Sequence, residues 1–473
     1  MHCPLVVLGG GPGGYAAAFL AADFGSEVTI VEEEGRLGGV CLLRGCIPSK
    51  ALLHVAKVIS EARHVAEWGV ELSAPNIDID KMRGRKEQVI KTLTGGLRQL
   101  AKKRKVRIIK ARGTLEGSQT LRLTGGDPKT YEDGDQLTFD RLILATGSSP
   151  AVPATFDLPS DRVMDSTGAL ALPDIPEKML VVGGGYIGLE MGTVYAELGS
   201  RVSVVELTDG LLPGADRDLV KPLHKRLEIL LENIYLKTKV TALIDQGDQI
   251  EVVMDGDRVA TEKFDRVLVS IGRRPNSHSI GLETTKVEMD ERGFVITDEQ
   301  QRTADPYILA IGDVAGEPML AHKAAHEGKV AAEVVAGESV AFDKLAIPAV
   351  VFTDPEIAWA GLTEEQAKRE GVAYKAAQYP WAASGRAQAV GATAGMTKLL
   401  FDPETERILG VGLVGSGAGE LIAEGVVAIE MGCTARDLAE SIHPHPTLSE
   451  TLAFASEVQL GLATEVYRPK RNR

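Results

Sequence analysis

Two cysteines lie five positions apart, at Cys41 and Cys46, in residues 38–50 just after a glycine-rich loop. A dithiol in such a place can exchange electrons with a ring cofactor. Residues five apart on a regular helix are separated by roughly 7.5 Å along the axis and about 140° around it, which is beyond the reach of a relaxed disulfide. A bridge therefore needs an irregular turn, which Gly45 and Pro48 can supply or tolerate. The alternative is two buried cysteines that are not linked.

The elements that would position this pair contain a pattern that the chain repeats. A short buried strand at residues 5–8 leads into the glycine loop 9–14, then into an alanine-rich helix to about residue 24 and a strand at 27–32. A single loop of this type can be a structural turn, but two copies indicate two dinucleotide sites. The second copy comprises the strand 180–182, the loop 183–188, a helix to about residue 198 and the strand 201–206.

Each copy places specific residue types where a dinucleotide needs them. The glycines permit a tight turn and a close approach of the backbone to a pyrophosphate, and the following helix offers free N–H groups. The second strand of each copy ends in a glutamate, Glu32 or Glu206, that can accept hydrogen bonds from a ribose. Residues 139–147 and 264–272 are a further matching pair, so each unit is predicted to be a parallel βαβ core with an antiparallel insert.

Composition limits the class of protein. A chain of 473 residues needs about three domains, and the formal charge of −14 argues against nucleic acid and anionic membrane surfaces as partners. The basic run at residues 102–105 is interpreted as a solvated helix end. Four cysteines are too few for a secreted disulfide framework, the first strand leaves no room for a leader, and no run of about twenty apolar residues occurs. We expect a cytoplasmic protein with no membrane span and no metal site.

Taken together, the motifs resemble the pyridine nucleotide–disulfide oxidoreductases over essentially the whole chain. The resemblance implies an α/β fold with two Rossmann-like dinucleotide-binding domains, for FAD and NAD, plus a C-terminal α+β dimerisation domain. We expect an FAD domain at 1–150, an NAD domain at 151–275, a central segment at 276–346 that completes the FAD domain, and an interface domain at 347–473. The motifs that carry the resemblance are the first glycine loop and residues 38–50, 145–147, 183–190, 272–276, 311–313 and 443–450.

The resemblance also implies how the cysteines work. A thiol attacks a disulfide as the thiolate, so a base must take its proton, and histidine suits this at neutral pH. In the family, substrate attacks the position of Cys41, and the position of Cys46 is nearer the flavin. The base matches His445, oriented by Glu450 and placed across a twofold dimer interface, so each active site is expected to need both chains of a homodimer.

Cofactor contacts follow from the same resemblance. Glu32 is expected to hold the FAD ribose, Asp313 to bond the ribityl–pyrophosphate portion, and Lys50 to lie near the flavin ring, paired with Glu190. The full set of residues expected to bind the cofactors is Gly9, Gly11, Pro12, Gly13, Gly14, Glu32, Gly39, Val40, Lys50, Gly113, Ala145, Thr146, Gly147, Ser148, Asp313, Met319, Leu320, Ala321 and His322 for FAD, and Gly183, Gly185, Tyr186, Ile187, Gly188, Glu190, Glu206, Val240 and Gly272 for NAD.

Glu206 favours NAD over NADP, because a carboxylate repels a 2′-phosphate and residues 207–210 carry no positive charge. Two departures from the family pattern bear on the substrate. Leu43 and Arg44 replace the usual Asn-Val, and Pro444 replaces the alanine between the two histidines. Arg44 either lowers a thiolate pKa or faces solvent.

The branch of the family that fits best oxidises protein-bound dihydrolipoamide and reduces NAD⁺. Its substrate would be carried by a lipoyl-bearing acyltransferase or carrier protein of a 2-oxo acid dehydrogenase complex or of the glycine cleavage system. Two alternatives stay open: an NADH-dependent reductase of another small disulfide, and a flavin-binding redox sensor or assembly subunit.

Overall fold

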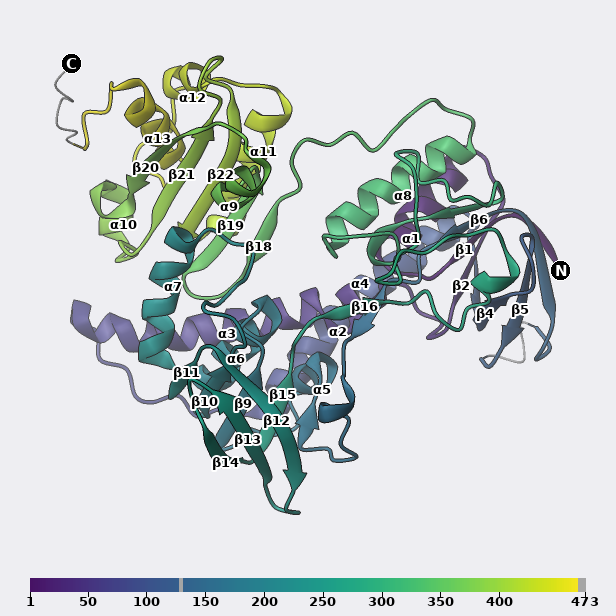
Figure 1. Cartoon of the computed structure of the whole chain (residues 1–473), viewed down its shortest axis with the longest axis horizontal. Helices are drawn as coiled ribbons and strands as arrows, with labels where there is room; N and C mark the ends of the chain where they lie inside the picture. Colours follow the sequence, from purple (N-terminus) through teal and green to yellow (C-terminus); the bar gives the residue numbers. More distant parts are fainter. Residues whose placement is uncertain (127–130, 467–473) are drawn as a thin grey trace.

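The computed structural model describes residues 1–126 and 131–466, which fold around three large sheets, with two smaller sheets beside them (Figure 1). The first sheet is built on the first glycine loop. Its parallel core has the order β3-β2-β1-β6. On the edge of β6 that faces away from β1, the antiparallel strand β5 pairs with the beginning of β6 and the parallel strand β17 pairs with its end. Strand β4 pairs with β5 and completes the antiparallel insert. The strands are β1 (His2–Leu8), β2 (Val28–Glu32), β3 (Arg107–Lys110), β4 (Arg112–Leu115), β5 (Thr120–Thr124), β6 (Gln136–Leu144) and β17 (Ile308–Ala310).

The second sheet repeats this architecture, as the sequence predicts. Five parallel strands have the order β11-β10-β9-β15-β8, and three antiparallel strands, β12 to β14, form a separate insert. The insert differs in one respect from the first copy, because a break at Asp265 separates β14 from β15 where β6 runs on without interruption. The strands are β8 (Val163–Met164), β9 (Lys178–Val182), β10 (Arg201–Val205), β11 (Asn233–Tyr235), β12 (Thr238–Asp245), β13 (Ile250–Gly256), β14 (Ala260–Phe264) and β15 (Arg266–Val269).

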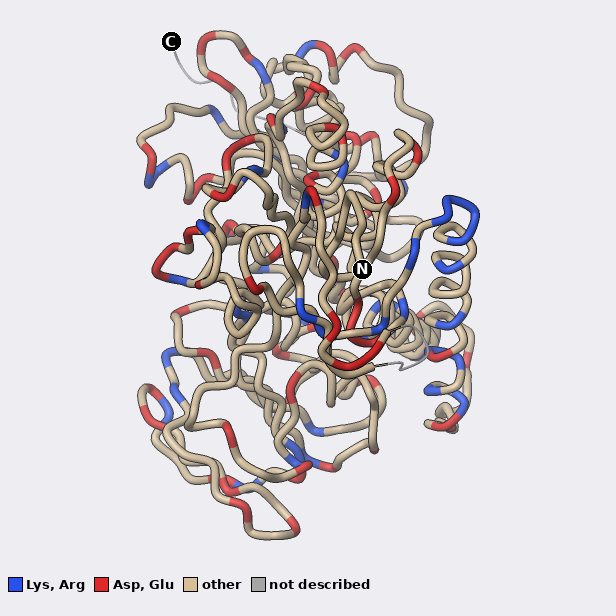
Figure 2. The backbone as a smooth tube through the Cα atoms, turned by 90° about the vertical axis from the view of Figure 1, so that its right-hand side faces the viewer, with Lys and Arg blue, Asp and Glu red and all other residues tan. Residues whose placement is uncertain are grey.

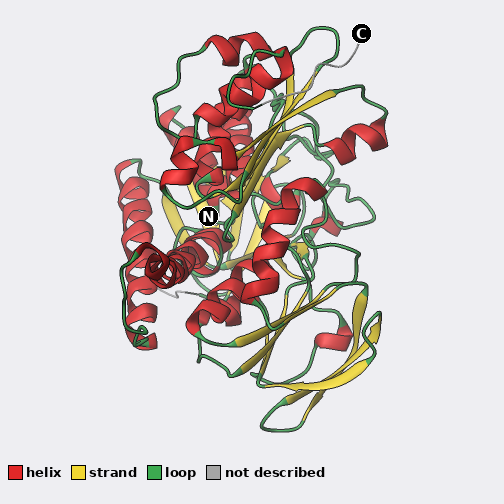
Figure 3. Cartoon of the chain, turned by 90° about the vertical axis from the view of Figure 1, so that its left-hand side faces the viewer, coloured by secondary structure: helices red, strands yellow, loops and turns green. Residues whose placement is uncertain are grey.

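The third sheet is antiparallel throughout, with the order β18-β19-β22-β21-β20. It lies at the top of Figures 1 and 3, with helices packed beside it, and the stretch after α8 crosses to it from the first sheet. Its elements are β18 (Ala349–Val351), β19 (Glu356–Gly361), α9 (Glu364–Glu370), β20 (Lys375–Pro380), α10 (Gly385–Ala389), β21 (Met396–Phe401), β22 (Ile408–Gly415), α11 (Ala418–Glu430), α12 (Ala435–Glu440) and α13 (Glu450–Leu460).

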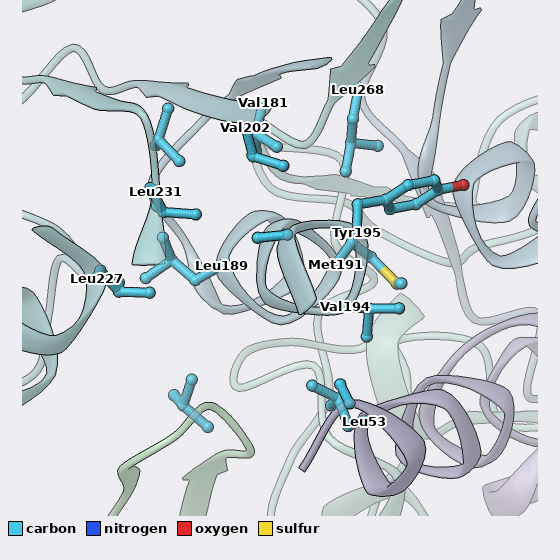
Figure 4. Packing of buried hydrophobic residues seen from close by; sticks show 14 of the residues in the cluster. Leu53, Val181, Leu189, Met191, Val194, Tyr195, Val202, Leu227, Leu231 and Leu268 are labelled. Atoms are coloured by element: carbon cyan, nitrogen blue, oxygen red, sulfur yellow. The ribbon is translucent and has the colours of Figure 1, made fainter. Parts of the chain in front are cut away.

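Helices connect these sheets and carry the candidate site. Against the first sheet, α1 (Pro12–Asp23) packs on α8 (Ala321–Val335). At the second sheet, α6 (Tyr186–Leu198) is buried almost all round, between the strands and α3 (Cys46–His64) (Figure 4). The labelled side chains in Figure 4 show Met191 and Val194 of α6 on the side of Leu53 of α3. The remaining helices are α2 (Gly39–Arg44), α4 (Ile79–Lys103), α5 (Ser166–Ala171) and α7 (Arg217–Leu230), and the short strands β7 (Ser148–Pro150) and β16 (Arg273–Pro275) pair where the first two parts meet.

Two surface features bear on the expected partners. Figure 2 shows the basic residues gathered at the end of α4, where the run at 102–105 ends the helix; within that run, Arg104 pairs with Asp23 at 2.9 Å. Among the described residues, one helical stretch, Gly39–Trp68, is long and apolar enough by length and composition to cross a membrane. Core helices of soluble proteins meet the same criterion of length and composition. Helix α3, which forms most of this stretch, packs on α6 and α4.

Candidate active site

The cysteine pair lies where two helices meet at an irregular residue. Gly45, with φ −145° and ψ −114°, ends α2 and begins α3, so Cys41 and Cys46 lie on different helices. A Cβ on Gly45 would lie 2.9 Å from the carbonyl oxygen of Val40, a contact that real Cβ atoms do not make. Both cysteines are free thiols, and they are hydrogen-bonded to each other. The irregular turn that a bridge requires is therefore present at Gly45.

The two thiols differ in acidity. The hydrogen bond that Cys41 donates is the largest cause that lowers the pKa of Cys46, to about 7; burial opposes this shift and the Lys50 ammonium adds to it. The same hydrogen bond, together with burial, raises the pKa of Cys41. When the pair ionises near neutral pH, the negative charge therefore resides on Cys46, and Cys41 keeps its proton.

The carboxylate of Glu190, on α6, joins three parts of the chain. Lys50 Nζ of α3 donates to its two oxygens at 2.9 and 3.0 Å, and the backbone N–H of Phe352, just after β18, donates to Oε1 at 3.0 Å. The ammonium of Lys50 also lies 4.4 Å from the centroid of the Phe352 ring, within cation–π range. This arrangement holds the Lys50 charge beside Cys46, where it lowers the pKa of the thiol.

A single cavity of about 1140 Å³ runs past the cysteines and the first glycine loop. Residues from both glycine-loop units contribute to its wall, since Tyr186, Ile187 and Glu190 of α6 face it as well. The predicted site residues that line it are Gly9, Gly11, Pro12, Gly13, Glu32, Gly39, Val40, Cys41, Cys46, Lys50, Gly113, Ala145, Thr146, Gly147, Ser148, Tyr186, Ile187, Glu190, Asp313, Met319 and Ala321.

The two glycine loops share a detailed geometry. Gly10 N donates to Glu32 at 2.6 Å, and Gly184 N donates to Glu206 at 2.6 Å, in each case across 22 residues. The first glycine of each loop has positive φ, +108° for Gly9 and +105° for Gly183, and a Cβ there would strike a carbonyl oxygen of the neighbouring strand end. Only glycine fits these positions, so the backbone can come close to a phosphate.

The residues of the cavity fit a dinucleotide. Its volume exceeds that of an ordinary small-ligand pocket, and no side chain caps the N-terminus of α1, where backbone N–H groups suit a pyrophosphate. Burial raises the pKa of Glu32, while two backbone N–H groups hold its oxygens at the end of β2. Asp313 accepts a hydrogen bond from Ser148 at 2.5 Å, so both polar side chains are held on the cavity wall.

Other predicted cofactor residues lie outside the cavity wall. Val240 of β12 is 8% exposed and packs in the core beside the second sheet. His322 forms a hydrogen bond with the carbonyl oxygen of Pro348 at 2.7 Å. The predicted residues that do not line the cavity are Gly14, Gly183, Gly185, Gly188, Glu206, Val240, Gly272, Leu320, His322, His445 and Glu450.

The histidine and glutamate of the C-terminal motif form a pair on the third part. His445 Nδ1 lies 2.9 Å from Glu450 Oε1, and the backbone N–H of Thr447 holds the other carboxylate oxygen at 2.8 Å. The His445 side chain is 76% exposed, so its second nitrogen is free to meet a partner. The neighbouring His443 is instead tied to Glu424 of α11 at 2.6 Å.

Several contacts were not predicted. The sequence carries no local signal for the contact between Phe352 and Glu190. Arg273 belongs to the motif at 272–276, and its contact, a hydrogen bond donated to Ser148 at 2.7 Å, has no signal in the sequence either. Three carboxylates, Asp216, Asp218 and Glu364, have the spacing of a metal site, but all three contact one buried ammonium, that of Lys398, at 2.6, 2.7 and 3.1 Å. This cluster is thus an ion-pair network joining α7 to the third part.

Comparison with known proteins agrees with this geometry. The chain belongs to the pyridine nucleotide–disulphide oxidoreductase family, whose model matches residues 4–328; the family's dimerisation domain matches residues 347–455 and supports a homodimer. The predicted fold class is confirmed.

Two relatives with similar sequences and two solved structures with a similar fold illustrate the comparison. The chain is 50% identical to a dihydrolipoyl dehydrogenase of Vibrio cholerae, covering 98% of this chain and 97% of the relative, and 44% identical to one of Geobacillus stearothermophilus, covering 96% of each. Among solved structures it resembles LpdA from Mycobacterium tuberculosis (TM-score 0.88, 27% identity, 96% of this chain and 99% of that one). It also resembles the HOCl-induced flavoprotein disulfide reductase RclA from Escherichia coli (TM-score 0.84, 26% identity, 96% and 99%).

Proposed function

We propose that the chain oxidises protein-bound dihydrolipoamide to lipoamide and reduces NAD⁺ to NADH, with FAD in the cavity. The observation that carries this proposal is the acidic Cys46 thiol, paired with Cys41, in a dinucleotide-sized cavity that both glycine-loop units line. The names of the relatives that are 44–50% identical along nearly the whole chain support the same activity.

FAD would be held by the first glycine loop, Glu32, Ser148 and Asp313, and NAD by the second loop and Glu206. When bound, the flavin supplies the two-electron acceptor that links the dithiol to the nicotinamide. Glu206 is turned toward its own loop by Gly184 N and Thr208, so it presents a negative charge where NADP would bring a phosphate.

The residues of this chain carry out the disulfide exchange and the proton transfers. In the oxidised enzyme Cys41 and Cys46 are joined, and one substrate thiolate attacks the sulfur of Cys41, releasing Cys46 as a thiolate. The second substrate thiol, after losing its proton, attacks the substrate sulfur of the mixed disulfide, which closes the lipoamide ring and frees Cys41. His445 takes the proton of each substrate thiol in turn, releasing the first to solvent and passing the second to the departing Cys41 thiolate, and Glu450 stabilises the imidazolium each time.

His445 would reach the cysteines of the other chain in a homodimer. This assignment is supported by the separation of α13 from α2 in Figure 1 and by the absence of His445 from the described cavity wall. It also agrees with the match to a dimerisation domain. We further infer the division at 1–150, 151–275, 276–346 and 347–473, a cytoplasmic location, and a lipoyl-bearing acyltransferase or carrier protein as partner.

Steady-state assay of the purified protein tests the activity. With dihydrolipoamide as donor, NADH should form rapidly and NADPH slowly, and Cys46→Ser should abolish both turnover and the long-wavelength absorption of the thiolate–flavin pair. Retention of both by Cys46→Ser would contradict the proposal. No turnover, with FAD bound and the cysteine bridge reducible, would point to a reductase of another small disulfide.

A further inference from the structure

Arg44 lies between the two cysteines in sequence, yet its side chain forms an ion pair with Glu34 and not with either thiol. Its guanidinium donates from Nη1 to Oε1 of Glu34, ten residues earlier. The neighbouring groups that set the pKa of Cys46 are Cys41, Lys50 and Glu190, and Arg44 is not among them. Of the two expectations for Arg44, a lowered thiolate pKa and a solvent-facing side chain, the second is closer, because the side chain is 40% exposed while it contacts Glu34.

The ion pair joins two segments of the cavity wall. The loop between them leaves β2 at Glu32 and returns through α2, and both Glu34 and Arg44 line the cavity. Its base is held to the first glycine loop, because Gly38 N donates to the carbonyl oxygen of Gly10 at 2.8 Å. Close packing adds to this, since a Cβ on Gly39 would lie 2.6 Å from the Cα of Gly11.

The pair also connects to the expected ribose site. Glu34 N donates to Oε1 of Glu32 at 3.1 Å, so the residue that pairs with Arg44 also orients the carboxylate at the end of β2. The side chain of Glu34 is 25% exposed and that of Arg44 is 40% exposed, so water screens the pair only in part. Breaking the pair would remove the side-chain contact between the segment after β2 and the end of α2, while the backbone hydrogen bonds at Glu34 and Gly38 remain.

We propose that Arg44 and Glu34 form a clasp that slows release of the dinucleotide from the cavity. The proposal rests on the proposed function only in taking FAD as the occupant. Arg44 is thus a positioning residue for the cofactor: it acts through Glu34 and the loop, and it leaves the acidity of Cys46 unchanged.

The test measures FAD release from the holoenzyme, followed by flavin fluorescence in the presence of an excess of a flavin scavenger. Arg44→Val and Glu34→Ala should each speed release by about 2-fold to 5-fold, the upper part of the range for loss of a partly exposed ion pair. The double variant should be no faster than the faster single variant, because both changes remove one interaction. The matched control is Arg36→Val: Arg36 Nε lies 3.6 Å from the other oxygen of Glu34, but Arg36 does not line the cavity, so release should stay at the wild-type rate.

A second readout separates the clasp from an effect on the thiols. The midpoint of the Cys46 titration, measured by alkylation rate against pH, should be the same in Arg44→Val and wild type. An unchanged release rate in Arg44→Val, or a shifted Cys46 midpoint, overturns the clasp. If FAD binds and the clasp variants behave as expected but dihydrolipoamide is not oxidised, the proposed function fails alone; if the protein takes up no FAD, both fail.

Discussion

Replacing Cys41 with alanine should make Cys46 a much weaker acid. The hydrogen bond from Cys41 is the largest cause that lowers the pKa of Cys46 from its usual 9.0 to about 7. Of the remaining causes, burial raises the pKa more than Lys50 lowers it, and Glu190 raises it more than the backbone hydrogen bond lowers it. Without Cys41 the pKa should therefore be at or above 9.0.

The size of the effect follows from the fraction of thiolate. At pH 7 a thiol with a pKa of about 7 is about half ionised, whereas one with a pKa of about 9 is about 1% ionised. A more basic thiolate is also a better nucleophile, which returns about 6-fold to 10-fold of this roughly 50-fold loss. Alkylation of Cys46 at pH 7 should then be about 5-fold to 8-fold slower in Cys41→Ala.

Alkylation by iodoacetamide under anaerobic, reducing conditions provides the assay. Arg44 lies between the two cysteines, so cleavage after arginine separates them and mass spectrometry can follow Cys46 alone. The rate should rise through a midpoint near pH 7 in the wild type and near pH 9 or above in Cys41→Ala, with Cys433→Ala as a control that keeps the wild-type midpoint. A midpoint that stays near 7 in Cys41→Ala would refute the reasoning and assign the acidity to Lys50 or to the bound cofactor.

Three further changes test other contacts. Glu450→Gln removes the anionic partner of His445, so dihydrolipoamide oxidation should fall about tenfold or more; an unchanged rate would exclude an orienting role. Glu206→Ala should lower the preference for NAD⁺ over NADP⁺ by about tenfold in kcat/KM, whereas an unchanged ratio would place discrimination elsewhere. Lys398→Met leaves three carboxylates without their buried cation and should lower stability by about 3–5 kcal/mol in urea unfolding; a change below about 1 kcal/mol would show that water or another cation compensates.

What the sequence predicts well is local. The glycine loops, the strands around them and the irregular turn at Gly45 depend on residues next to one another in the chain, since only glycine fits the close backbone contacts at Gly9 and Gly183. The fold class followed from the repetition of these units together with the family resemblance.

What the sequence leaves open depends on long-range contacts. Lysine is usually found at the surface, yet the side chain of Lys398 is only 2% exposed and lies among carboxylates from two other elements. Phe352 reaches Glu190 across 162 residues through a backbone N–H, which no side-chain pattern encodes. The matching segments near Asp140 and Asp265 predict the same strand arrangement in both units. The strand is interrupted only at Asp265, whose carboxylate accepts a hydrogen bond from Lys178 N at 2.8 Å.

The position of His445, on a different part of the chain from the cysteine cavity, has a consequence for how defects combine. If each catalytic centre takes its thiols from one subunit and its base from the other, a chain lacking Cys46 and a chain lacking His445 are each inactive alone. In a mixed dimer of the two, one centre inherits both defects and the other inherits neither. Two null alleles would then complement each other within one cell, although neither chain is repaired.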